Sequence, residues 1–434
     1  MARINWELSQ LSFAQPGKGR SMPTVALLGT FDTKQVEYRW LRDQLTAAGC
    51  AVLGVDVGSF SDGGGLADVS SAEVASAAGA DLDELRAKND RGAAMEAMGA
   101  GAAAVVTRLY QEGRLDGVLA VGGSGGSSVA GRAMHALPVG VPKLLVSTMA
   151  SGDVRPYVGD VDVTLMYSVV DVSGVNSVSR LVLGNAVAAV AAMAAAHERR
   201  RAEPPPDHRR PVVAATMFGL TTPAVDEARA VLTDLGYEVL VFHATGAGGR
   251  AMESLVTSGL VDGVLDLTTT ELADDLVGGV LTAGPQRLEA AGRVGIPQVV
   301  SVGALDMVNF GPRETVPERF ADRTFLVHNP TVTLMRTTPA EMAALGRRIA
   351  AKLTGSTGPV EVFLPRQGVS GIDRAGGQFE DRAADEACFA EIRSGLAGSA
   401  VAVWELDSHI NDEGFGRAAA EALHRLITTH RGNG

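Results

Sequence analysis

Cysteine and positive charge are both scarce in this chain of 434 residues. The two cysteines, Cys50 and Cys388, stand at no spacing that is typical of a zinc site. Isolated thiols fit a reducing compartment, so we expect a cytoplasmic protein. Lysine and arginine number 38 against 50 aspartates and glutamates, which gives a formal net charge of -12. A domain-wide basic surface is thereby excluded, and nucleic acid is not an expected partner.

Long apolar runs are also lacking. The first twenty residues contain no apolar signal core. The Ala-rich run Ala186–Ala196 is shorter than the roughly 20 residues that a membrane-spanning helix needs, so we expect no membrane partner. Charged residues make up 20% and hydrophobic residues 46% of the chain, which is typical of a globular protein. A small anion remains a possible ligand, because backbone N–H groups with one or two cations suffice to hold it.

Strands and helices alternate along most of the chain. An apolar strand at Thr24–Leu28 is followed by a helical pattern at Gln35–Ala48 and by a second strand at Ala51–Val55. Such alternation predicts a parallel sheet. The same succession starts again near residue 211. We therefore predict an α/β protein with two doubly wound, Rossmann-like parallel-sheet domains, and we expect it to form a homo-oligomer.

A charged stretch with three consecutive prolines, HERRRAEPPPDHRR at 197–210, separates the two halves. Consecutive prolines stiffen and extend a chain, as a linker requires. We therefore place an N-terminal arm at 1–22, a first domain at 23–196, the linker at 197–210 and a second domain at 211–434.

A glycine-rich loop is the strongest local signal in the first half. It follows a strand at Gly117–Val121 and precedes a helix from about Val129. Strand, glycine-rich turn and helix is the order that points backbone N–H groups and a helix dipole at a phosphate. The loop matches neither the Walker A sequence nor the dinucleotide fingerprint. The candidate phosphate-binding residues here are Gly122, Gly123, Ser124, Gly125, Gly126 and Ser127.

Two other interpretations of this loop stay open. It can be a purely structural tight turn. Gly122, Ser124 and Gly126 also spell G-x-S-x-G, the pattern of a nucleophile elbow. A serine hydrolase is the minor hypothesis, because the nearby histidines, His135 and His197, fall in the next helix and in the linker.

The segment after the first strand, Gly29 to Lys34, occupies the corresponding position at the start of the domain. Its candidate cofactor-binding residues are Gly29, Thr30, Asp32 and Lys34. Lys34 is suited to pair with a phosphate, and Asp32 to hold Mg²⁺ directly or through water. The alternative is a helix cap at Asp32 or Thr33, with Lys34 in solvent.

Polar residues follow the strands predicted for the second half. Two apolar runs, Gln298–Val302 and Thr324–Val327, are predicted to be buried strands of a parallel sheet. Ligands bind at the carboxyl ends of such strands. Histidines beside carboxylates are typical of acid–base chemistry or of a divalent metal site, although Asp and Asn are also common in caps and turns. The candidate catalytic residues are His243, Asp266, Asp306, His328, His409 and Asp412, with Arg336 and the Gly246–Arg250 loop as an anion site beside them.

Several long motifs make a family resemblance recognisable. They are GTFDTK (29–34), VGGSGGSS (121–128), HATGAGGRAMESL (243–255), LDLTTTEL (265–272), GIPQVVSVGALDMVNFGP (295–312), VHNPTVTLMRTT (327–338) and DSHINDEGF (407–415). From about Thr24 onward the chain resembles a family of bacterial and plant proteins that includes the N-terminal domain of the tomato mosaic virus resistance protein. The resemblance implies two Rossmann-like domains that bind ATP with Mg²⁺, and it implies no particular reaction. The plant protein's inhibition of viral replication is not transferred.

Two functional hypotheses follow. In the first, the chain is an ATP-binding enzyme whose first domain holds Mg-nucleotide, while the cluster in the second domain acts on a small acidic metabolite. In the second, the chain is a nucleotide-responsive binding module without turnover. A metal- or serine-dependent hydrolase is a minor alternative. In each of the first two we expect the phosphates on the Gly122–Ser128 loop, with Gly29–Lys34 beside it.

Overall fold

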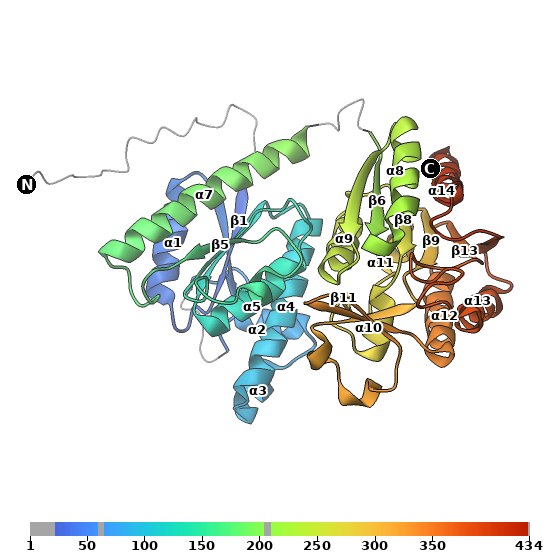
Figure 1. Cartoon of the computed structure of the whole chain (residues 1–434). Coiled ribbons are helices and arrows are strands. Elements are labelled where there is room, and N and C mark those ends of the chain that lie inside the picture. The colour runs from blue at the N-terminus through green and yellow to red at the C-terminus, as the bar shows by residue number, and fades with distance from the viewer. Residues whose placement is uncertain (1–21, 60–64, 204–209, 433–434) are drawn as a thin grey trace, which may run out of the picture. The chain divides into compact units, whose positions relative to one another are not determined.

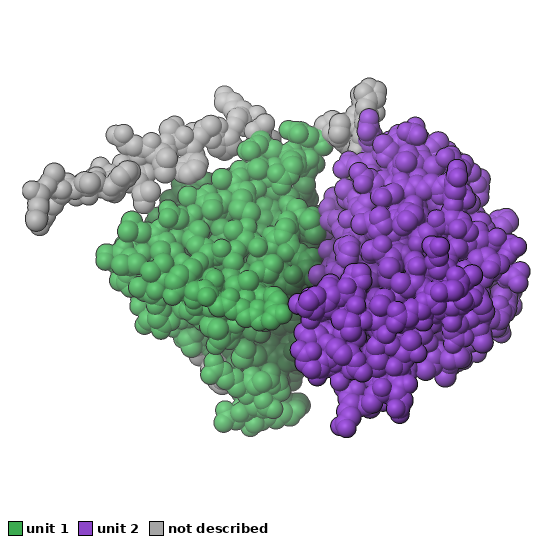
Figure 2. Space-filling view, in the orientation of Figure 1, with its two compact units in different colours: residues 1–205 green, residues 206–434 purple. Residues whose placement is uncertain are grey.

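The computed structural model describes residues 22–59, 65–203 and 210–432. The chain divides into two compact units, residues 1–205 and 206–434 (Figure 2). Nearly all of the predicted N-terminal arm and the three linker prolines lie outside the described residues.

The first unit is built on a five-stranded parallel sheet of order β2-β1-β3-β4-β5 (Figure 1). The strand order runs in opposite directions on the two sides of β1, so a topological switch point lies between β1 and β3. Ligands of open α/β sheets bind at such a point, outside the carboxyl ends of the strands. The strands are β1 (Thr24–Gly29), β2 (Ala51–Asp56), β3 (Gly117–Gly122), β4 (Lys143–Ser147) and β5 (Thr164–Tyr167).

Helices cover both faces of this sheet, because alternate residues of each strand point to opposite sides. Ala26 and Leu28 pack with α4 and α5, whereas Val25 and Leu27 pack with α1 and α7. The helices of the unit are α1 (Gln35–Ala47), α2 (Ser71–Ala77), α3 (Leu82–Lys88), α4 (Arg91–Gln111), α5 (Ser124–His135), α6 (Arg155–Val158) and α7 (Ser177–Ala202).

Helix α7 is longer than the sequence pattern indicates. It continues past Ala196 into the charged stretch and ends at Ala202, a length of 26 residues. An 18-residue window of this helix has a mean hydropathy of 1.6, so by length and composition alone the helix is able to cross a membrane. The expectation that no stretch is long and apolar enough was wrong. Core helices pass the same test, and Leu183 and Val190 of α7 are buried against the sheet.

The second unit repeats the architecture with a six-stranded parallel sheet of order β14-β13-β9-β8-β6-β7. The predicted fold class is confirmed. The strands are β6 (Val212–Met217), β7 (Glu238–His243), β8 (Gly263–Thr268), β9 (Gln298–Gly303), β13 (Val360–Pro365) and β14 (Ala402–Leu406). The helices are α8 (Thr222–Asp234), α9 (Ala247–Thr257), α10 (Glu271–Val277), α11 (Ala290–Val294), α12 (Pro339–Thr354), α13 (Arg382–Leu396) and α14 (Phe415–Gly432).

The predicted parallel strand at Thr324–Val327 was wrong. β11 (Phe325–Asn329) pairs with β12 (Val332–Arg336), and β12 pairs with β10 (Met307–Phe310), in a separate antiparallel sheet. The turn after β11 explains the difference, because the Asn329 side chain accepts the Thr331 N–H at 2.9 Å and the chain reverses there. His328 therefore lies within an exposed strand and not at the end of a parallel one.

Tyr38 of α1 joins the ends of β1 and β3 at the switch point. Its hydroxyl accepts the Val121 N–H at 3.0 Å and lies 2.6 Å from the Val121 carbonyl oxygen. A side chain at Gly29 would place Cβ 1.9 Å from the Tyr38 ring, so only glycine fits at the end of β1. Burial raises the pKa of Tyr38 well above its usual range, which keeps the phenol protonated.

Tyr38→Phe removes the hydroxyl and leaves the buried Val121 N–H without its acceptor. We expect the first unit to lose about 1–3 kcal/mol of unfolding free energy, the usual penalty for a buried unpaired donor. Urea unfolding measured by circular dichroism checks this. Tyr167→Phe on exposed β5 is the control and should leave the transition unchanged. Equal midpoints for Tyr38→Phe and the wild type would contradict this role for the hydroxyl.

Candidate functional site

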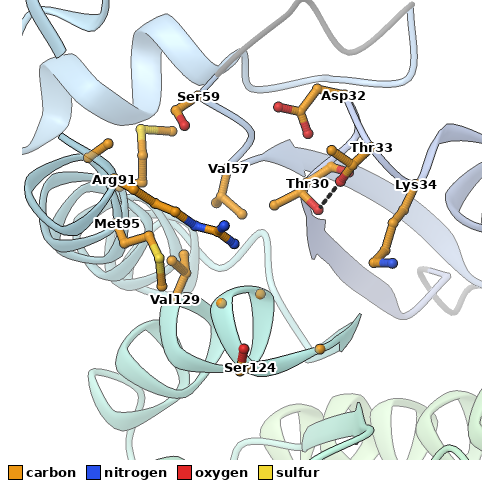
Figure 3. A pocket seen from close by; sticks show the side chains of 15 residues that line it. Thr30, Asp32, Thr33, Lys34, Val57, Ser59, Arg91, Met95, Ser124 and Val129 are labelled. Carbon is orange, nitrogen blue, oxygen red and sulfur yellow. Dashed lines mark hydrogen bonds between the residues drawn. The ribbon is translucent and has the colours of Figure 1, made fainter. Parts of the chain in front are cut away.

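A cavity of about 300 Å³ lies at the switch point of the first unit. Four parts of the chain line it: the loop after β1, the residues after β2, the first turns of α4, and the first turn of α5 (Figure 3). The lining residues are Thr30, Asp32, Thr33, Lys34, Val57, Ser59, Arg91, Ala94, Met95, Met98, Gly123, Ser124, Gly125, Gly126 and Val129. The two loops that sequence analysis selected in the first domain therefore border one cavity.

The glycine-rich loop is shorter than predicted, because helix α5 already begins at Ser124. Gly123 is its N-cap residue and offers no side-chain cap, and the first helical bond runs from the Ser127 N–H to the Gly123 carbonyl at 2.9 Å. The N–H groups of the first turn have no partner within a helix. The cavity is lined by the first residues of α5, which are Ser124, Gly125 and Gly126. Their N–H groups lie at the positive end of the helix dipole.

Three predicted cofactor-binding residues support the cavity without lining it. Gly29 and Gly122 allow close packing, since a Cβ on Gly122 would lie 3.1 Å from the Gly126 Cα atom. Ser127 is fully buried, and its Oγ lies 2.7 Å from the Oγ of Ser147. Ser147 in turn accepts the Met149 N–H at 3.0 Å, so the two serines fix the β4 loop beside α5.

The loop after β1 is fixed by a buried carboxylate at the end of β2. Asp56 accepts the N–H groups of Phe31 at 3.1 Å and Gly58 at 2.9 Å. Lys34 is the N-cap residue of α1, where the sequence suggested Asp32 or Thr33. Its ammonium group donates to the Val172 carbonyl at 2.5 Å. The Asp32 carboxylate lies beside Gly58, where a Cβ would approach it to 2.6 Å.

Arg91 is a cavity residue that sequence analysis missed. It is the first residue of α4, and its guanidinium reaches into the cavity from the side opposite Lys34 (Figure 3). A Cβ on Gly125 would lie 3.5 Å from Arg91 Nη2, which places the guanidinium next to the first turn of α5. Lys34, Arg91 and the helix N-terminus together favour a ligand with several negative charges.

In the second unit, a carboxylate of the chain itself occupies the corresponding kind of glycine-rich turn. Gly246 and Gly249, at the start of α9, donate their N–H groups to Glu271 Oε1 at 2.6 and 3.0 Å. A Cβ on Gly249 would lie 2.2 Å from Glu271 Oε2, so the carboxylate fills the turn. The anion position expected at Gly246–Arg250 is therefore already filled by Glu271.

Asp266 belongs to a buried ion cluster. The fully buried Arg287 contacts Asp266 Oδ2 at 2.5 Å and Asp266 Oδ1 at 2.7 Å, and its Nε donates to Glu271 at 2.7 Å. Thr216 also donates to Asp266, at 2.7 Å. Burial works to lower the pKa of Arg287, but the surrounding carboxylates raise it above its usual value. Both carboxylate oxygens of Asp266 are thus bound by groups of the same unit. Arg287 is a residue that sequence analysis missed.

Asp306 and His409 meet in one hydrogen-bond network. Ser370 donates its hydroxyl to Asp306 at 2.8 Å, and its carbonyl oxygen lies 2.8 Å from His409 Nε2. His409 Nδ1 accepts the Asn411 N–H at 3.0 Å, so the imidazole proton must be on Nε2. Both ring nitrogens are therefore engaged within the unit. Asp412 accepts the His409 N–H at 2.8 Å, as a turn residue does.

The three candidate histidines do not form one cluster. His243 ends β7 and packs its ring 5.5 Å from Phe218, whereas His409 follows β14 at the opposite edge of the sheet. His328 is exposed on β11 in the separate sheet. Within residues 22–59, 65–203 and 210–432, no three His, Cys, Asp or Glu side chains are arranged to hold a metal ion.

Asp306, Asp373 and Asp385 form a buried acidic group around Arg336. Burial, reinforced by Asp373, raises the pKa of Asp306 to about 7 and that of Asp385 to about 8. Arg336 donates to Asp385 at 2.9 Å and lies 3.8 Å from Asp373. Its positive charge opposes the rise in the pKa of Asp306 and Asp385. Near neutral pH the group therefore retains protons that solvated carboxyls would lose.

Asp306→Asn tests this proton retention. A carboxyl whose folded pKa is raised stabilises the fold below its unfolded pKa, and this stability is lost as pH rises through the folded pKa near 7. We expect the wild type to lose stability as pH rises from about 4, the unfolded pKa, to about 8, and the variant to be more stable by about 2 kcal/mol at pH 8.5. Thermal unfolding across this pH range measures both. Parallel pH profiles for the two proteins would contradict the prediction.

Comparison with known proteins places the chain in a family. Residues 23–199 and 210–427 match the N-terminal and C-terminal domains of the Uncharacterised protein family UPF0261. A UPF0261 protein of Clostridium tetani is 48% identical over 93% of this chain and 98% of its own length. The ToMV resistance protein Tm-1 of Solanum lycopersicum is 40% identical over 94% of this chain and 56% of its own length.

The similarity to solved structures is much weaker than these matches. The glycosyltransferase SnogD from Streptomyces nogalater is 14% identical over 94% of this chain and 99% of its own, with a TM-score of 0.19. A likeness of that size carries no argument about function. The two halves of the chain match the two domains of one family, and the relative from Clostridium tetani covers nearly the whole chain. These matches agree with the resemblance that the motifs indicate. The chain belongs to the UPF0261 family.

Proposed function

We propose that the first unit binds a nucleoside triphosphate, ATP with Mg²⁺, in the cavity at its switch point. One observation carries the proposal: the loops after β1 and β3, on the two sides of the switch point, line a single cavity at the start of α5. This is the position at which open α/β sheets bind nucleotides. In the second unit, Glu271 already occupies the glycine-rich turn at Gly246–Gly249. This supports the first unit as the site of the nucleotide.

The cavity residues divide into a charged part and an apolar part. The phosphates would accept N–H groups from the first turn of α5, with Lys34 and Arg91 as counter-charges. Mg²⁺ takes oxygen ligands and commonly bridges phosphates and one carboxylate, a role that Asp32 fits. Met95, Met98 and Val57 would contact the base. Sulfur atoms and aromatic rings attract each other, so methionine side chains are suited to contact the base.

Between the two functional hypotheses, the second unit favours a nucleotide-responsive binding module. Asp266 is paired with a buried arginine, and His409 uses both ring nitrogens inside the unit. An acid or base in a catalytic site must reach its substrate. Asp306 is fully buried as well, so none of these three side chains is presented to a small metabolite in this conformation.

Titration calorimetry with MgATP tests the nucleotide site directly. In Gly125→Val the new side chain extends toward Arg91 and Met95 and fills the space between them and the first turn of α5. We expect at least a tenfold loss of affinity, a change of about 1.4 kcal/mol. The matched control is Gly184→Val on α7, where a Cβ meets nothing within 4 Å. Wild-type affinity in Gly125→Val would contradict the proposed position.

A second measurement separates the module from the enzyme. A binding module should change its sedimentation rate or scattering profile when MgATP is added, while release of phosphate stays at the rate of buffer alone. Hydrolysis of ATP that is lost in Gly125→Val would instead assign an ATPase activity to the first unit. Unchanged hydrodynamics with bound ATP would count against a response to the nucleotide.

A further inference from the structure

The connection between β5 and α7, residues 168–176, is tied to the first unit by two polar contacts with the start of α1. Lys34 Nζ donates to the Val172 carbonyl at 2.5 Å, and Glu37 Oε1 accepts the Gly174 N–H at 2.5 Å. The Val172 side chain adds an apolar contact, because it is 5% exposed and packs in the core beside α1 and α7. Lys34 lines the cavity, so one of the two polar contacts is made by a cavity residue.

The docked connection contains a backbone conformation that its sequence disfavours. Val169 has a φ of 65°, in the left-handed region that β-branched residues avoid. Its side chain is 58% exposed, so burial of that side chain does not compensate for the conformation. Ser168, just before Val169, donates its N–H to the Ser147 carbonyl at 3.2 Å. Val172 and Gly174 after it bind Lys34 and Glu37, so contacts on both sides hold the conformation. Losing one of those contacts would let the connection relax.

We infer that an anion in the cavity and the docked connection compete for the ammonium group of Lys34. The inference rests on the proposed nucleotide site and adds its regulation. Lys34 donates to a neutral carbonyl in this structure, and a bond from an ammonium to a phosphate is stronger because both partners are charged. Val172 does not line the cavity, so the ammonium group must turn from its carbonyl to reach a phosphate there. Residues 168–176 are then held only by Glu37 and the Val172 side chain, and they loosen. By linkage, any surface that holds these residues docked weakens nucleotide binding.

Hydrogen–deuterium exchange on the full chain, with and without saturating MgATP, tests the competition. We expect peptides that cover residues 168–176 to exchange faster when ATP is bound. The turn at Pro138–Pro142 is an internal control, because Lys143 Nζ donates to its carbonyls at 2.7 and 3.0 Å outside the cavity. Its exchange should not change. Slower or unchanged exchange at 168–176, with ATP binding proven by calorimetry, overturns the inference.

Two variants complete the test. Lys34→Met should raise exchange at 168–176 without ligand, and ATP should add no further change there. Val169→Asn lies outside the cavity and relieves the left-handed conformation, which Asn tolerates. It should slow exchange in the free protein and weaken MgATP binding by roughly threefold. Wild-type affinity in Val169→Asn overturns the inference, whereas absence of ATP binding in the wild type overturns the proposed nucleotide site.

Discussion

The backbone N–H groups at the start of a helix need acceptors, and the two units satisfy this need in different ways. In the second unit, Glu271 supplies the acceptor to the turn before α9 and is itself neutralised by Arg287. In the first unit, the N-cap residue of α5 has no side chain, and the turn borders a cavity that also contains Lys34 and Arg91. In the second unit a side chain of the protein itself accepts these N–H groups. In the first unit a ligand bound in the cavity could accept them.

This difference explains the charge arrangement of each unit. Burying Arg287 removes it from water, so the surrounding carboxylates must hold it, and breaking such a pair typically costs about 3–5 kcal/mol. The cluster therefore joins the interior strand β8 to α10 in the second unit, and its carboxylates are not available for binding. Lys34 and Arg91 both line the cavity and are not fully buried. Arg91 extends its guanidinium into the cavity, whereas the Lys34 ammonium group is bound to the Val172 carbonyl. A polyanion would satisfy the helix and both cations at once.

The sequence was sufficient to predict features that depend on local order. Strand, glycine-rich turn and helix are contiguous in the chain, so the loops at Gly29 and Gly122 could be selected without coordinates, and parallel sheets follow from the alternation of elements. Arg91 could not be found in this way, because its place beside Gly125 depends on the packing of α4 against α5.

The prediction that the three histidines form one cluster was wrong for a related reason. Order along the chain does not give order across the sheet, and β7 and β14 are its opposite edges. The antiparallel insertion added a second difference, since the Asn329–Thr331 turn reverses the chain and places His328 on a separate sheet. Arg287 was missed because its burial depends on three carboxylates from separate elements of the chain. Their proximity to Arg287 cannot be deduced from the order of residues.

A crystal structure of the full chain with Mg²⁺ and a non-hydrolysable ATP analogue tests the central claim most directly. We expect phosphate density against the first turn of α5, within hydrogen-bond reach of its N–H groups and of Arg91. We also expect Lys34 to have left the Val172 carbonyl. Density for the nucleotide in the second unit, with the first cavity empty, would show that the first unit is not the nucleotide site.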